Sequence, residues 1–379
     1  MLMRDSDGSR AWEKAKVLLK QGQYDDALEK LRYAASKGHV EAITLQGDLY
    51  AQGRHVEKDL KLARSLYLQA AKLGHSAAQY KLADCYLRGL GTDANPDKAV
   101  KWYRKAAEQG HVAAQFALGK CYMDGIGLSK DYQQALKWFR KAAKQRYDAA
   151  QFMLGVYYAI GQGGVEKSDT EAAKWFRRSA EQGYVAAQYA LVLSYEEGRG
   201  VPQDSVEAAK WCRKAAEQGY PDAQFMLGIY YTGGLGGLQT SYSEAAKWYR
   251  RAAEQGHAES QLMLALSYEE GKGVPQDNVE AAGWYRKAAE QGNAEAQIKL
   301  GLYYGKGLGG LPERDTEAVK WFRRAAEQGN VLAQYLLGSC YEDGTGVPKD
   351  LKEAVKWYQK AAEQGDEDAI KKLRKLNVR

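Results

Sequence analysis

One short stretch of this sequence recurs along almost its whole length. The string WYRKAAEQGNAEAQIKLGLYY, residues 284–304, has close copies at seven other places. Each copy begins at a tryptophan, so eight of the nine tryptophans occupy one repeated slot: Trp102, Trp138, Trp175, Trp211, Trp248, Trp284, Trp321 and Trp357. Self-similarity at a fixed period is typical of architectures in which each unit packs only on its neighbours. The period therefore predicts one continuous array, although 379 residues would otherwise suggest two or three globular domains.

The repeated units are 36 or 37 residues long when they are aligned on a recurring glutamine. That glutamine stands at Gln79, Gln115, Gln151, Gln188, Gln224, Gln261, Gln297 and Gln334. Each unit contains a first helical pattern of the AAQFMLGVYY type, a glycine-containing loop, and a second helical pattern of the VEAAKWYRKAAEQ type. We name these two segments helix A and helix B. The pattern predicts an all-α chain of helix pairs.

The ends of helix B carry recognisable signals. Seven residues before the repeated tryptophan slot, which the first unit fills with a leucine, the side chains are those that accept hydrogen bonds from free helix N–H groups, namely Asp59, Asn95, Asp131, Ser168, Asp204, Ser241, Asp277 and Asp350. Arg314 departs from this pattern, with Asp315 one residue late. A glycine that can adopt a left-handed conformation follows AAEQ in most units, but the third unit has Arg146 there. We expect that substitution to strain or lengthen the turn.

Composition narrows the class of protein. The formal charge of +7 is modest and is distributed through the repeats, which is typical of a solvated surface. No apolar run is long enough to span a membrane, and MLMRDSDGSRAWEK at the N-terminus lacks the apolar core of an export signal. We therefore expect a cytoplasmic protein, or a periplasmic or secreted one if a signal has been removed. Cys85, Cys121, Cys212 and Cys340 form no pair within a unit, which predicts small apolar packing residues.

The repeated residues resemble the Sel-one-like repeat (SLR) family of tetratricopeptide-like solenoids, whose pattern is A-x-x-L-G-x-x-Y-x-x-G-x-G-V-x-x-D followed by A-x-x-W-Y-x-x-A-A-x-x-G. One unit matches through Ala223, Leu227, Gly228, Tyr231, Ala245, Trp248, Tyr249, Ala252, Ala253 and Gly256. Another shows the loop through Gly271, Gly273, Val274 and Asp277. The resemblance implies a right-handed α-solenoid (superhelix) of antiparallel helix pairs. We expect a tetratricopeptide-like capping pair at 10–39, nine repeats at 40–366 and a C-terminal capping helix at 367–379.

The resemblance also implies an adaptor that binds partner proteins in a concave groove lined by helix A. Mapped onto this chain, two apolar rows should border that groove: Phe152, Val156, Tyr189, Leu193, Phe225, Ile229, Leu262, Leu266, Ile298 and Leu302. Carboxylates follow on the same face at Glu196, Glu197, Glu269 and Glu270. An apolar strip edged by acids suits an amphipathic or extended segment that carries Lys or Arg. The alternative is that the aromatic residues are core and the acids are merely solvated.

Other chemistry finds little support in the sequence. The glycine loops lack the Lys-Ser/Thr of a phosphate-binding loop, and their acids lack the alternation of a calcium loop. The repeated tryptophans have the spacing of packing residues. Four histidines, His39, His75, His111 and His257, follow the helix-B glycine, and even those one repeat apart are too far from each other to share a zinc ion. We expect no cofactor, no metal and no catalytic constellation.

The resulting prediction is a non-enzymatic, monomeric scaffold that binds a protein or peptide and no small-molecule substrate or nucleic acid. The main alternative is a β-lactam-binding or β-lactamase-like enzyme, as suggested for cysteine-rich relatives, although this chain lacks their paired cysteines. A second alternative is an RNA-binding solenoid, which would need a basic inner face. The inner positions predicted here are apolar and acidic.

Overall fold

The computed structural model describes residues 6–376, which form twenty-one α-helices and no β-strand. Residues 1–5 and 377–379 lie outside the described part, which therefore does not include the end of the predicted capping helix 367–379. No helix in the described range combines the length and the apolar composition that a membrane crossing requires.

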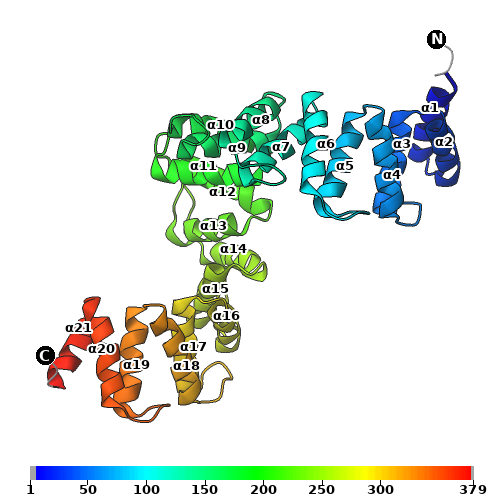
Figure 1. Ribbon diagram of the computed structural model, residues 1–379. Coiled ribbons are helices and arrows are strands. Elements are labelled where there is room, and N and C mark those ends of the chain that lie inside the picture. Colours follow the sequence, from blue (N-terminus) through cyan, green and yellow to red (C-terminus); the bar gives the residue numbers. More distant parts are fainter. Residues whose placement is uncertain (1–5, 377–379) are drawn as a thin grey trace. The chain divides into compact units, whose positions relative to one another are not determined.

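The helices follow one another as pairs joined by short turns (Figure 1). The first pair is α1 (Ser6–Lys20) and α2 (Tyr24–Ser36). The A helices are α3 (Val40–Gln52), α5 (Ser76–Arg88), α7 (Val112–Asp124), α9 (Asp148–Ile160), α11 (Val185–Glu197), α13 (Pro221–Gly233), α15 (Ala258–Glu270), α17 (Ala294–Lys306) and α19 (Val331–Asp343). The B helices are α4 (Leu60–Lys72), α6 (Pro96–Glu108), α8 (Tyr132–Lys144), α10 (Asp169–Glu181), α12 (Ser205–Glu217), α14 (Tyr242–Glu254), α16 (Asn278–Glu290), α18 (Asp315–Glu327) and α20 (Leu351–Glu363). The last helix is α21 (Glu367–Lys375).

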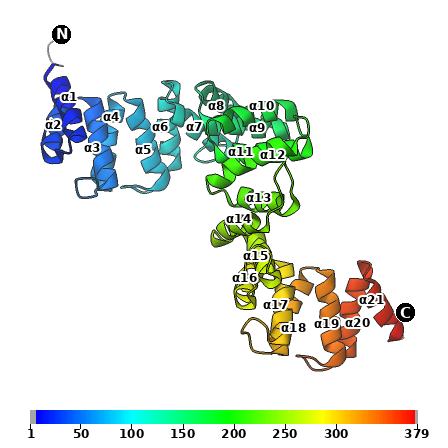
Figure 2. The same ribbon diagram turned by 180° about the vertical axis from the view of Figure 1, so that it is seen from behind.

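The chain divides into two compact units within α11. The first comprises residues 1–187 with 199–201, and the second comprises 188–198 with 202–379. Within each unit helix A packs against helix B of its own repeat, and helix B packs against helix A of the next (Figure 2). The all-α solenoid of paired helices that the sequence predicts is therefore what the chain forms.

The local signals at the helix ends behave as predicted. All eight predicted N-cap side chains accept a hydrogen bond from a backbone N–H in the first turn of helix B, as Asp204 does from Val206 and Glu207. Arg314 occupies the N-cap position of α18 and makes no side-chain cap hydrogen bond. Arg146 adopts the left-handed conformation with φ 62°, at a position where the other repeats have glycine. That conformation costs an L-residue roughly 1–2 kcal/mol, so the third repeat is locally strained.

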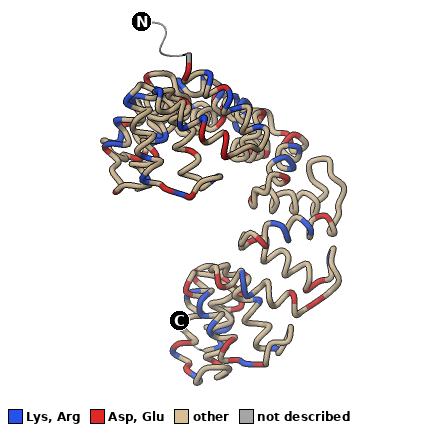
Figure 3. The backbone as a smooth tube through the Cα atoms, turned by 90° about the vertical axis from the view of Figure 1, so that its right-hand side faces the viewer, with Lys and Arg blue, Asp and Glu red and all other residues tan. Residues whose placement is uncertain are grey.

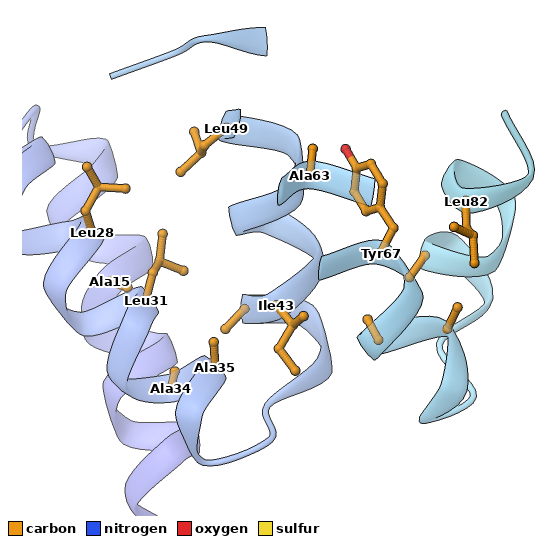
Figure 4. Packing of buried hydrophobic residues seen from close by; sticks show 14 of the residues in the cluster. Ala15, Leu28, Leu31, Ala34, Ala35, Ile43, Leu49, Ala63, Tyr67 and Leu82 are labelled. Atoms are coloured by element: carbon orange, nitrogen blue, oxygen red, sulfur yellow. The ribbon is translucent and has the colours of Figure 1, made fainter. Parts of the chain in front are cut away.

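The core consists of alanines and, from each helix B except α12, one aromatic ring packed on a small residue of helix A. Near the N-terminal end, Leu31, Ile43, Tyr67 and Leu82 come from four successive helices (Figure 4). In the sixth repeat Gly228 makes room for a ring, since a Cβ there would lie 2.3 Å from Tyr249. Where helix B instead has the small Cys212, helix A has Val192, as conservation of core volume requires.

The repeated tryptophans also serve packing. Those at Trp138, Trp211, Trp248, Trp284 and Trp357 are buried, whereas Trp102, Trp175 and Trp321 are half-buried. A Lys or Arg three residues later lies over each ring, for example Lys287 at 3.7 Å from the centroid of Trp284. These cation–π contacts cover the rings from the solvent side.

Buried glutamines link consecutive repeats, a role that the sequence did not reveal. The Gln224 amide donates through Nε2 to the carbonyl of Ala216 at the end of α12, at 3.1 Å. Its Oε1 accepts from Nε2 of Gln255, just past α14, at 2.8 Å. The same pair of bonds occurs at Gln79, Gln115, Gln151, Gln261, Gln297 and Gln334. Each such glutamine therefore ties the C-terminal ends of two successive B helices together.

Candidate functional site

The residues that follow the buried glutamines lie in the joints between repeats. The ring of Phe225 is 6.0 Å from that of Tyr249 and 5.1 Å from that of His257, which begins the next helix A. Phe152 meets Phe176 and Tyr184 in the same way. The remaining three members of this predicted row are Tyr189, which contacts Tyr220, and Leu262 and Ile298, which are only 7% and 5% exposed. These five side chains therefore contribute mainly to the joints.

The second predicted row is more accessible. Its members are half-buried side chains at one position of five successive A helices: Val156, Leu193, Ile229, Leu266 and Leu302. Val156 and Phe152 belong to the first unit and the other twelve predicted site residues to the second. Within the second unit Phe225, Ile229, Leu262 and Leu266 join one cluster, and Ile298 and Leu302 join the next. We name Leu193, Ile229, Leu266 and Leu302 the aliphatic row.

The predicted carboxylates lie beside this row, and Glu196 and Glu269 are hydrogen-bonded to side chains of other helices. Glu196 accepts a hydrogen bond from the Tyr230 hydroxyl. Glu269 accepts from the Tyr285 hydroxyl at 2.6 Å and from Lys299 Nζ at 2.8 Å. Burial alone would raise the pKa of Glu269, but the hydrogen bonds from Lys299 and Tyr285 outweigh it, and the pKa is lowered. Glu269 is therefore ionised and already neutralised by a neighbouring helix A.

The other two carboxylates are exposed at the ends of their helices. Glu270 forms an ion pair with Lys272 at 2.7 Å, and Glu197 is exposed. Exposed pairs of this kind contribute about 0–1 kcal/mol and are screened by salt. A bound segment can therefore compete for Glu270 more readily than for Glu269.

The arrangement around Glu269 is a recurring motif. Glu342 accepts from Tyr358 at 2.6 Å and from Lys372 at 2.7 Å, and the pKa of its carboxyl is lowered by those bonds. Asp48 plays the same part between Tyr67 and Lys81, at 2.7 and 2.8 Å. Sequence reasoning missed this motif because the acid comes from different turns of helix A. The sequence signal for this motif is a lysine in the following unit, two residues after the position of the recurring glutamine.

The groups that would support nucleophilic or metal chemistry are used structurally. All four cysteines are free and buried, and burial raises the pKa of Cys212 to about 12 and of the other three to about 11. His111 and His257 each accept a backbone N–H through Nδ1 as the N-cap of the next helix A. Within residues 6–376 no three His, Cys, Asp or Glu side chains gather as metal ligands would.

Comparison with known proteins identifies the repeats. The Sel1 repeat family model matches nine consecutive stretches, 41–75, 76–111, 112–147, 148–184, 185–220, 221–257, 258–293, 294–330 and 331–366. The crystal structure of c5321, a protective antigen of uropathogenic Escherichia coli with an SLR fold, is 37% identical, with a TM-score of 0.80 over 96% of this chain and 78% of that one. A Sel1 repeat protein from Oxalobacter formigenes is 34% identical, with a TM-score of 0.63 over 86% of this chain and 93% of that one. A search of curated proteins finds no match.

Proposed function

Because this chain belongs to the Sel1 repeat family, with nine repeats covering most of its length, we propose that it is a non-catalytic scaffold that binds a segment of a partner protein. The proposed binding surface is the A-helix face of the second unit, centred on the aliphatic row. The observation that carries the proposal is that four successive A helices each leave an aliphatic side chain half-exposed at one position. Apolar side chains aligned in this way favour association with a complementary apolar segment.

The spacing of the row suggests the form of the partner. Direct bonds between successive A helices, such as Lys299 to Glu269 at 2.8 Å, place neighbouring A helices side by side. A helix with its side chains is about 10–12 Å across, so neighbouring A helices lie roughly that far apart. A helical partner rises about 10.5 Å in seven residues, and an extended one about 10 Å in three. An apolar residue at every seventh or every third position would therefore meet one member of the row per repeat.

Charge plays the smaller part in this proposal. Glu269 is already neutralised by Lys299, so a basic residue of the partner would gain little from it. Glu270 stands at the exposed end of its helix, where a Lys or Arg of an amphipathic segment would compete only with the solvent-screened pair to Lys272. We infer that the apolar contacts supply most of the affinity and the carboxylates orient the segment.

The test draws its ligands from a random peptide display library, so the natural partner need not be identified first. Peptides are selected on the wild-type chain and then measured against the double variant Ile229→Asp with Leu266→Asp. When the peptide covers the exposed half of each aliphatic side chain, binding gains about 1 kcal/mol per side chain. Loss of both side chains should therefore weaken binding roughly 30-fold. The control is Val206→Asp with Val279→Asp, which removes two exposed apolar residues from B helices.

Thermal melting followed by circular dichroism establishes that both double variants are folded. Selected peptides should carry apolar residues at the spacing given above and should bind the control variant normally. Peptides that bind the Ile229→Asp, Leu266→Asp variant as tightly as wild type would refute the aliphatic row as the binding surface.

A further inference from the structure

The third repeat departs from the others at the C-terminal end of its helix B. Where the other tryptophan-bearing repeats end in AEQG, this one ends in Lys144, Gln145 and Arg146. Arg146 is held in a left-handed conformation that glycine adopts without strain. A cation at a helix C-terminus interacts favourably with the helix dipole. However, the other tryptophan-bearing repeats have a glutamate at this helix end, so the helix dipole alone does not explain the lysine. Strain retained at one repeat of an array invites a functional explanation.

Lys144 lies at the rim of a surface hollow of about 460 Å³ on α8. The hollow is lined by Gln133, Leu136, Lys137, Arg140, Lys141, Lys144, Gly163 and Gly164. Four cations thus face one concavity, and α8 contains no acidic residue at all. Among the B helices only α4 also lacks acidic residues, and it carries the three cations Lys61, Arg64 and Lys72. Along most of the chain Lys and Arg are interleaved with Asp and Glu (Figure 3).

The eighth repeat supplies an internal comparison, because it has a hollow of the same volume at the equivalent positions. That hollow is lined by Thr316, Val319, Lys320, Arg323, Arg324, Glu327, Gly346 and Val347. Glu327 stands where the third repeat has Lys144. Lys320 is neutralised by Glu317 at 2.5 Å, whereas Lys137 has Gln134 at the matching position. Among residues 6–376 neither Lys137 nor Lys144 forms an ion pair.

A second hollow of about 390 Å³ adjoins the first and shares Lys144 with it. It is lined by Ala143, Lys144, Arg146, Gln151, Trp175, Arg178, Glu181 and Gln182. The guanidinium of Arg178 lies over the ring of Trp175 at 4.5 Å, which orients it in the hollow that Arg146 also lines. The two hollows together present Lys137, Arg140, Lys141, Lys144, Arg146 and Arg178 against the single carboxylate of Glu181.

We propose that these two hollows form a binding site for a small ligand that bears two or more phosphate groups. Guanidinium and ammonium groups together are the usual partners of phosphate oxygens, and Arg contributes paired N–H donors. Two hollows that share Lys144 suit two anionic groups of one ligand better than a single anion. The volumes are those of small-molecule sites, and the cations are concentrated in one repeat. The site belongs to the first unit and is independent of the aliphatic row.

The test restores the ordinary repeat ending. The variant Lys144→Glu with Arg146→Gly re-creates AAEQG and relieves the left-handed arginine, so it should fold at least as stably as wild type. Isothermal titration with inorganic tripolyphosphate is carried out on both proteins, at low and at physiological salt. Tripolyphosphate should bind wild type, and its affinity for this variant should be at least about tenfold lower. The reciprocal variant Glu317→Gln with Glu327→Lys should add a second, weaker site in the eighth repeat.

The source of the phosphate is resolved by two further arms. Flotation with phosphatidylcholine vesicles, with and without cardiolipin, tests whether the phosphates belong to a lipid headgroup. Binding that depends on cardiolipin, and that is lost in the Lys144→Glu, Arg146→Gly variant, would support the site and assign it to a membrane surface. Single-stranded RNA that binds while tripolyphosphate neither binds nor competes would overturn the small-ligand assignment. Equal tripolyphosphate affinity of wild type and the restored variant would overturn the site.

Discussion

Replacing Gln224 with methionine tests whether the buried glutamines hold the repeats together. Methionine has nearly the same length, so the change removes the bonds to Ala216 and from Gln255 without opening a cavity. Each bond contributes about 1 kcal/mol, so we expect a loss of roughly 2 kcal/mol of stability. The Ala216 carbonyl still accepts from the backbone N–H of Gly219, which keeps the cost from being larger. Gln239→Met, at an exposed loop position, is the control and should be neutral.

The partner substitution shows whether the effect arises in the bond itself. Gln255→Met leaves the buried oxygen of Gln224 without its donor, at a cost of about 1–3 kcal/mol. The double variant should cost less than the sum of the two, by about 1 kcal/mol. Because solenoids need not unfold in one step, hydrogen exchange of α12 to α14 is measured beside urea unfolding. Additive costs, or a Gln224→Met variant as stable as Gln239→Met, would show that the reasoning is wrong.

Three further outcomes are expected. Gly228→Ala should cost about 1–3 kcal/mol in urea unfolding, because its Cβ would lie 2.3 Å from a tyrosine ring, whereas Gly283→Ala, with open space around it, should stabilise by up to about 1 kcal/mol. The pKa of Glu269 is lower in the folded chain than in the unfolded one, so its ionised form stabilises the fold fully above the unfolded pKa, and this stability is lost as the pH falls through the folded pKa. The melting temperature should therefore drop below about pH 4.5, and it should drop less steeply in Glu269→Gln. An equal drop in both proteins would argue against the pair with Lys299. Burial raises the pKa of Cys212 to about 12, so its alkylation at pH 8 should be far slower in the folded chain than in urea. Rapid alkylation of the native thiol would contradict its burial. Nitrocefin turnover should also be absent.

The features that the sequence predicted correctly are those set by residues close together in the chain. The cap at Asp204 and the glycine that follows most B helices act within a few residues, so their roles are readable without a structure. Arg146 could be identified as a strained position for the same reason. The period itself is a local pattern repeated many times, and it was sufficient to indicate the solenoid of helix pairs.

The exposure of the side chains on the candidate binding surface could be predicted only in part. The position five residues after the glutamine was assigned to an accessible face, and the structure leaves those side chains half-buried. The position one residue after the glutamine was assigned to the same surface, yet Leu262 and Ile298 are in the core because they fill the joint between repeats. Helical periodicity gives the direction of a side chain around its own helix, but whether a neighbouring repeat covers it depends on packing.

The sequence by itself determined the repeat, the helix boundaries and the fold, since propensities, caps and left-handed turns act over one or two turns of chain. Only the tertiary structure decided that Gln224 joins two B helices and that Glu269 is paired with Lys299, because these partners stand about thirty residues apart. It also decided that Lys144 lines two adjoining basic hollows, whereas Glu327 places a carboxylate in the equivalent hollow of the eighth repeat. Contacts between repeats depend on how side chains of different units meet in space, and a period along the chain does not contain that information.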